Sequence, residues 1–174
     1  MNRTVFLVPV VALAACSGGS TSAPTPVDPA LSIALFSDIR NRASFASANL
    51  TNTGSASYDG YIDIVDFSDS SAAIGELTAT VNFGAGTYSM SADNWVEVDA
   101  TTDEVVTGSL SGTGTLTNTS GIAGITGDLS GKVDDVDIDV VINGTFTGSS
   151  GSVPDGLIGG DDSGTHSVAF ALDD

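Results

Sequence analysis

Hydrophobic positions along the chain follow a helical period between residues 28 and 50. Apolar side chains recur there every three or four residues and form one stripe, with Ser, Asp, Arg and Asn on the opposite side. Asp28 can cap the amides of the first turn, and Pro29 suits the first helical position. We therefore predict one amphipathic helix over 28–50 that packs onto the domain behind it. Its apolar stripe consists of Leu31, Leu35, Ile39, Ala43, Ala46 and Leu50.

From Ser55 onwards the period changes to two, which is typical of β-strands with one buried face. Turn signals rich in Gly, Asn and Asp separate about eight such segments. One side of each strand is apolar and the other carries Asp, Glu, Ser and Thr. The positions expected to face the core are Tyr58, Ile62, Ile64, Leu77, Ala79, Val81, Phe83, Tyr88, Met90, Ala92, Leu110, Leu116, Ala123, Ile125, Leu129, Val133, Val136, Ile138, Val140, Ile142, Val168, Phe170 and Leu172.

Short links between consecutive strands favour an antiparallel meander, and closing a meander into a barrel removes its exposed edges. The sequence therefore predicts an all-β domain over 51–174, an eight-stranded antiparallel up-and-down β-barrel preceded by one N-terminal helix. A barrel that spans the outer membrane would need an apolar outer face with aromatic girdles. Here aromatic residues make up only 6% of the chain and one strand face is polar, so we expect a soluble barrel.

The first 15 residues have the layout of a secretory signal peptide. Arg3 is followed by a short apolar run and by two small residues, Ala14 and Ala15. The run is too short for a spanning helix, which needs about 20 apolar residues. Residues 16–27, which are mostly Ser, Gly, Thr and Pro, then form a flexible tether.

Cys16 is the only cysteine of the chain and stands at the expected cleavage point. The stretch Leu13–Cys16 resembles a bacterial lipobox, and this resemblance implies that Cys16 is acylated and becomes the new amino terminus. More than one acyl chain makes such an anchor stable. Ser17, in place of Asp, favours the outer membrane as the location. The alternative is an ordinary signal peptide with an incidental cysteine.

The formal net charge of the chain is −18, with four basic residues against 22 acidic ones. This excess excludes nucleic-acid binding through phosphate neutralisation, which needs clustered Lys and Arg. The shortage of Lys and Arg also argues against the helix as a membrane-surface element. Strong net charge favours solubility, although a saline habitat or binding of divalent cations would also suit it.

Several segments resemble the transferrin-binding-protein-like lipoproteins, whose shared part is the small C-terminal barrel of the transferrin-binding protein B type. They are "TGSASYDGYIDI", "IGELTATVNFGAGTYSMSADNW" and "NGTFTGSSGSVPDGLIGG", which follow the lipobox, the tether and one helix. The resemblance implies an outer-membrane or surface lipoprotein that binds a protein or an iron-related ligand through its loops. Full-length members of that family have two lobes with handle domains, whereas this chain has one barrel.

Catalytic motifs are absent from the sequence: no Ser stands in a nucleophile elbow, and acidic residues are too numerous for any pair to be informative. We therefore predict no enzymatic activity and no cofactor. The single histidine, His166, is expected to be structural, because it lacks the partners that a zinc site needs. Calcium is the remaining metal candidate. The acidic residues that suggest it are Asp134, Asp135, Asp137, Asp139, Asp161 and Asp162.

Two loops are candidates for a partner site, because recognition residues concentrate on loops held by a rigid scaffold. The first spans about residues 94–105 and carries Asn94 and Trp95, of which Trp95 could be a binding anchor or could fold back to plug the barrel. The second is "GSSGSVPDG" near residue 150. The first hypothesis is a binding module for a protein or small molecule; the second is an envelope protein with an acidic barrel, no specific ligand and associated calcium.

Overall fold

The computed structural model describes residues 27–50, 53–65, 67, 71–98, 103–148, 153–161 and 166–174. The expected signal peptide, Cys16 and nearly all of the tether lie outside the described residues. Two helices come first, α1 (Pro29–Arg40) and the 3₁₀ helix η1 (Ser47–Asn49). The strands are β1 (Ser55–Val65), β2 (Ala72–Asn82), β3 (Thr87–Val98), β4 (Asp103–Val106), β5 (Gly108–Thr119), β6 (Ile122–Val133), β7 (Val136–Thr147), β8 (Gly156–Asp161) and β9 (Ser167–Asp173).

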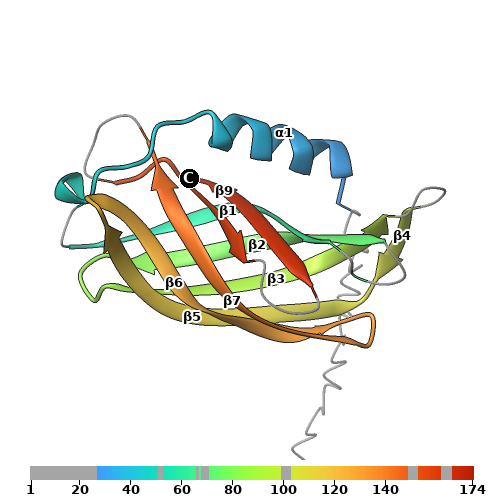
Figure 1. Ribbon diagram of the computed structural model, residues 1–174. Coiled ribbons are helices and arrows are strands. Elements are labelled where there is room, and N and C mark those ends of the chain that lie inside the picture. The colour runs from blue at the N-terminus through green and yellow to red at the C-terminus, as the bar shows by residue number, and fades with distance from the viewer. Residues whose placement is uncertain are drawn as a thin grey trace, which may run out of the picture.

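The strands form a closed antiparallel barrel, as predicted (Figure 1). Eight of them pair in ring order β1, β2, β3, β5, β6, β7, β8 and β9, and β9 returns to β1. The short β4 pairs only with the end of β3, from Trp95 to Val98, and then leads into β5. No helix among the described residues has the length and apolar character needed to cross a membrane.

The expected core positions face the inside of the barrel. Almost all of them are buried in one cluster, and Leu116 and Val136 are partly buried against it. Paired glycines make room for large rings within this core. A Cβ at Gly114 or Gly127 would lie 2.6 Å or 2.5 Å from atoms of the Tyr88 side chain. Because Tyr88, Gly114 and Gly127 occupy one row across β3, β5 and β6, the ring takes the space that two side chains would fill.

The two-residue turn between β6 and β7 consists of Asp134 and Asp135, both with positive φ (42° and 66°). A hairpin turn of this kind requires positive φ at both central positions, and Asp adopts that conformation more readily than most residues. The geometry of the turn therefore accounts for the presence of Asp at positions 134 and 135. The described part of the chain contains no group of three His, Cys, Asp or Glu residues placed to hold a metal ion.

Helix α1 is shorter than predicted, and its buried face coincides only partly with the predicted stripe. It ends at Arg40, with Asn41 as its C-cap, and the residues that it buries are Ser32, Phe36 and Ile39. The expected cap is present, because Asp28 Oδ1 accepts a hydrogen bond of 2.9 Å from the amide of Ala30. The predicted stripe is wrong at Leu31, which is 55% exposed, whereas Leu35 is partly buried and Ile39 is fully buried against the barrel.

The segment after α1, predicted to be helical, instead closes one end of the barrel. The Phe45 amide donates to the carbonyl of Phe146 at 2.8 Å, and the carbonyl of Phe45 accepts from the Ala123 amide at 3.0 Å. The Phe45 side chain is buried in the barrel core. Pairing with the ends of β6 and β7 satisfies the same backbone groups that a longer helix would have used. The apolar residues at 43–50 therefore serve the barrel end and do not extend the helical stripe.

Candidate functional site

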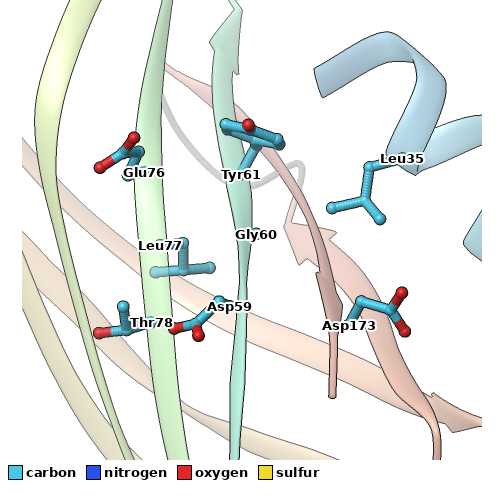
Figure 2. A pocket seen from close by; sticks show the side chains of 8 residues that line it. All are labelled: Leu35, Asp59, Gly60, Tyr61, Glu76, Leu77, Thr78 and Asp173. Atoms are coloured by element: carbon cyan, nitrogen blue, oxygen red, sulfur yellow. The ribbon is translucent and has the colours of Figure 1, made fainter. Parts of the chain in front are cut away.

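An open groove of about 340 Å³ lies where α1 meets the outer wall of the barrel (Figure 2). Leu35 reaches towards it from the helix, while the strands β1, β2 and β9 supply the other side chains. Among the described residues that line it, none is basic and three carry carboxylates. The lining residues are Leu35, Asp59, Gly60, Tyr61, Glu76, Leu77, Thr78 and Asp173.

The alternation of β1 and β2 explains the chemistry of this groove. Tyr58 and Ile62 point into the core, so that Asp59 and Tyr61 between them point outwards. Tyr61 lies opposite Glu76 of β2 in the register, and Asp59 lies opposite Thr78. On its other side, Asp59 is opposite Asp173 of β9. The barrel thus brings carboxylates from three neighbouring strands to one surface, beside one aromatic ring.

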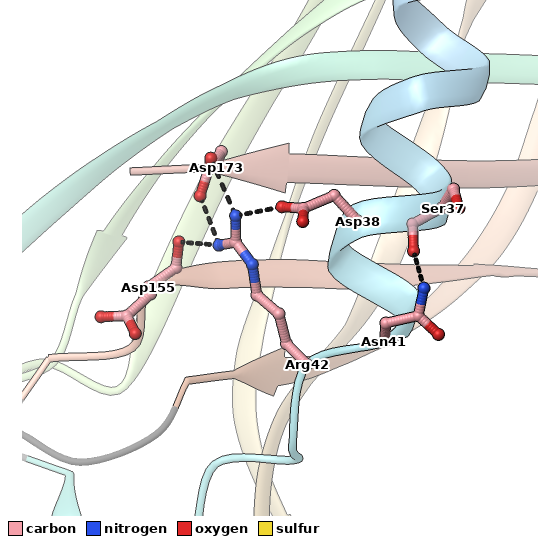
Figure 3. Close-up of polar contacts among 6 residues, drawn as sticks. All are labelled: Ser37, Asp38, Asn41, Arg42, Asp155 and Asp173. Atoms are coloured by element: carbon pink, nitrogen blue, oxygen red, sulfur yellow. Dashed lines mark hydrogen bonds and ion pairs between the residues drawn. The ribbon is translucent and has the colours of Figure 1, made fainter.

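Asp173 differs from the other two acids because Arg42 neutralises it (Figure 3). The guanidinium donates at 2.6 Å to Oδ1 and at 3.1 Å to Oδ2 of Asp173, and also binds Asp38 and the carbonyl of Asp155. These hydrogen bonds hold the pKa of Asp173 below its usual value. Asp59 and Glu76 are exposed and have no ion-pair partner among the described residues. The negative charge of the groove therefore comes mainly from these two side chains.

A second hollow, of about 400 Å³, lies along α1 over β1 and β9. Asp63 of β1 lies there beneath the helix, where Ser32 Oγ donates to its Oδ1 at 3.0 Å. Burial raises the pKa of this carboxyl group, and the Ser32 hydrogen bond only partly opposes the shift. Since Ser32 is itself fully buried, the Ser32–Asp63 pair is mainly a polar contact between helix and barrel. The hollow is lined by Ile33, Phe36, Ser37, Arg40, Asn41, Asp63 and Ala169.

Trp95 lies in a strand and not in a loop, contrary to the expectation from the sequence, and of the two alternatives for its side chain the buried one is observed. β3 continues through Val98, and the Trp95 side chain is fully buried in the barrel core. A β-bulge places it there: Asn94 has φ of 52°, and the β2–β3 register shifts at this point. The Trp95 indole Nε1 has no hydrogen-bond partner in the described structure. The role of Asn94 and Trp95 in ligand binding stays a prediction, although Trp95 offers no surface for an exposed anchor.

The remaining predicted residues are dispersed. The central residues of the second candidate loop, 149–152, and Cys16 lie outside the described residues, as do Asp162 and the side chain of Asp161. Next to that loop, Asp155 contributes only its carbonyl to Arg42. His166 is partly exposed just before β9. The groove depends on two features. The sequence indicates the first, that Asp59 and Tyr61 point outwards from β1. It does not indicate the second, the place where α1 packs on the barrel, and the groove could therefore not be predicted.

Searches for similar proteins give no family model, no curated protein and no solved structure that matches this chain. The resemblance to transferrin-binding-protein-like lipoproteins therefore stays an expectation drawn from the sequence.

Proposed function

We propose that this chain is a lipid-anchored lipoprotein of the outer membrane that acts as a binding module without catalytic activity, and that its ligand occupies the groove in Figure 2. The observation that carries the proposal is an open groove of about 340 Å³ whose described lining combines two unpaired carboxylates with Tyr61 and Leu35. Ligand pockets of about 300–1,000 Å³ with a mainly apolar lining and a few polar groups are typical of proteins.

The chemistry of the lining favours an organic cation with an apolar or aromatic body. Asp59 and Glu76 attract the positive charge, and the face of Tyr61 adds a cation–π contact. Such a group occurs on small amines and on the Lys or Arg side chains of a protein partner. A metal ion fits less well, because no described cluster of three His, Cys, Asp or Glu residues is present. The ligand class is thus compatible with a protein partner, as the family resemblance implies.

The lipid anchor is inferred from the sequence at Cys16. Acylation there would hold the barrel near the membrane surface, because the tether over residues 16–27 is only twelve residues long. Labelling of the expressed full-length protein with a palmitate analogue, followed by mass spectrometry of the amino-terminal peptide, tests this part. Cys16→Ala should abolish the label and release the protein from the membrane fraction.

An envelope protein without a specific ligand is the second candidate, and the packing of the barrel favours it. Its interior is filled by a continuous cluster of buried side chains, including Trp95, Tyr58 and Phe170. A ligand inside the barrel would have to displace this core. The second candidate therefore predicts that no cationic probe binds in the groove of Figure 2.

Titration of the isotope-labelled protein with benzyltrimethylammonium, followed by NMR, separates the two candidates. Saturable shifts centred on Tyr61 and Thr78, reduced about tenfold in affinity by Asp59→Asn with Glu76→Gln, are expected if the groove binds cations. Glu104→Gln with Asp139→Asn removes the same number of exposed charges elsewhere and is the matched control. Equal weakening by both pairs of substitutions would indicate nonspecific attraction to an acidic protein and would contradict the groove.

A further inference from the structure

The first two turns of α1 present an apolar surface to solvent. Ala30, Leu31, Ile33 and Ala34 are all exposed, and Ile33, at 68%, is the most exposed large apolar side chain in the described part of the chain. Between Asp28 and Asp38 the helix carries no charge. The buried side of the helix, formed by Ser32, Phe36 and Ile39, already holds it to the barrel. The fold therefore does not require apolar side chains at positions 31 and 33.

This surface lies beside the point where the tether joins the domain. Val27, the first described residue, is buried against Ile74 and Val96 on the outside of the barrel and leads directly into α1. The stretch from Cys16 to Val27 can span at most about 40 Å when fully extended. An acylated Cys16 would thus keep the start of α1 within about 40 Å of the bilayer surface, a distance about twice the length of this helix.

We propose that the exposed face of α1, defined by Ala30, Leu31, Ile33 and Ala34, lies on the bilayer in which Cys16 is anchored. The inference rests on the proposed function, because it requires the lipid at Cys16. Helices that bind membranes from solution are rich in Lys and Arg on their polar face, whereas α1 carries no basic residue before Arg40. A tethered helix does not need them, because attachment makes contact with the surface an intramolecular event at high effective concentration. An uncharged apolar face is then sufficient.

The contact would define how the barrel is presented. α1 covers β8, β9 and β1, and β5 lies on the opposite wall of the ring (Figure 1). With α1 on the bilayer, the Ser- and Thr-rich outer face of β5 points away from the membrane. The groove of Figure 2 opens at the flank of α1, close to the headgroups. Its ligand would then be one that reaches the membrane surface.

Depth-dependent quenching in phosphatidylcholine vesicles tests the contact with the full-length acylated protein. Acylation consumes the thiol of Cys16, so a cysteine introduced by Ile33→Cys or Thr115→Cys can carry a single NBD fluorophore. Thr115 is exposed on β5 and is the matched control. Lipids with a nitroxide high in the acyl chain should quench the label at 33 at least about twofold more than the label at 115. Equal quenching at the two positions would overturn the proposal.

A second variant separates the lipid contact from folding. Leu31→Ser with Ile33→Ser changes only exposed side chains, so the melting temperature should stay the same, while a label introduced by Ala34→Cys should lose its quenching by nitroxide lipids. Retained quenching would show that these two side chains do not hold the helix on the bilayer. A label at 33 that is shielded from water but not quenched by lipid would indicate a protein partner or a second copy and would also overturn the proposal.

Mass spectrometry of the same preparation distinguishes this failure from failure of the anchor. If Cys16 is acylated and the label at 33 remains in water, the helix contact is wrong and the anchor stands. If Cys16 carries no lipid in the membrane fraction, both the anchor and the helix contact are wrong.

Discussion

Arg42, just beyond the end of α1, donates two hydrogen bonds to the carboxylate of Asp173 at the end of β9. The pair joins residues 131 positions apart in the chain, and Asp38 and the carbonyl of Asp155 complete the ring of acceptors (Figure 3). It thereby locks the helix, the last strand and the segment before β8 together. Arg42 is one of only four basic residues in the chain. Its ion pair with Asp173 holds the end of α1 against the barrel beside the groove.

Arg42→Ala should lower the free energy of unfolding by about 1–2 kcal/mol, because it removes a partly buried bidentate charge pair and leaves Asp173 without its partner. Urea unfolding followed by circular dichroism measures this change. Arg40→Ala removes the same charge two residues earlier, where no ion pair is formed among the described residues, and should change stability by less than about 0.5 kcal/mol. Equal losses for the two variants would contradict the structural role of Arg42.

The same pair predicts an acid limb in the stability curve. Because Arg42 lowers the pKa of Asp173 below its ordinary value of 3.8, the stabilisation is present above that value and is lost as the pH falls through the lowered pKa. Urea midpoints of unfolding, measured at a series of pH values from about 5 down to about 2, should fall less steeply with pH in Asp173→Asn than in the unmodified protein. An identical slope would mean that the pair does not contribute in solution.

Asp63 should show the opposite dependence. Burial beneath α1 raises its pKa above 3.8, so ionisation costs stability as the pH rises from that value through the raised pKa. Asp63→Asn keeps an acceptor for the Ser32 hydroxyl without the charge and should raise the urea midpoint at neutral pH, with no gain at low pH. Asp139→Asn, on an exposed position of β7, is the control for the change in net charge. A gain of the same size in Asp139→Asn would attribute the effect to general repulsion.

Gly75 and Trp95 should be energetically coupled. A Cβ at Gly75 would lie 2.7 Å from the Trp95 ring, and the three nearest atoms all belong to that side chain. Gly75→Ala alone should cost about 1–3 kcal/mol through overpacking. In a Trp95→Leu background, where the ring is absent, the same substitution should cost much less, so that a double-mutant cycle gives a coupling of about 1 kcal/mol or more. Additive losses would mean that the ring does not rest on Gly75.

The part of the fold that the sequence predicted is the part set by local alternation. Tyr58, Leu77 and Val140 were assigned to the core from a period of two, and all three are buried there. Closure of the barrel followed from the same pattern, because a meander of about eight strands can bury one face and leave no open edges in this way.

The helix and the loops were predicted less well for two identifiable reasons. Apolar residues at 43–50 continue the spacing of α1, yet Phe45 gains more by pairing with β6 and β7 and sealing the barrel end. The sequence predicts a loop after the third strand that carries Trp95, whereas a β-bulge at Asn94 absorbs the extra residue and keeps the strand intact through Val98. Neither pairing is visible in a local pattern, since each depends on residues far away in the chain.

The sequence by itself determined the class of the domain, the inward face of each strand and the candidate lipid site at Cys16, because these depend on residue type and on short spacings. Only the tertiary structure decided where α1 lies on the barrel, and with it the acidic groove beside Tyr61 and the exposed apolar face at Leu31 and Ile33. The physical reason is that a helix with apolar residues on several sides can bury any of them. Phe36 and Ile39 pack against Ala171 of the barrel, and the Ser32–Asp63 hydrogen bond lies on the same side of the helix.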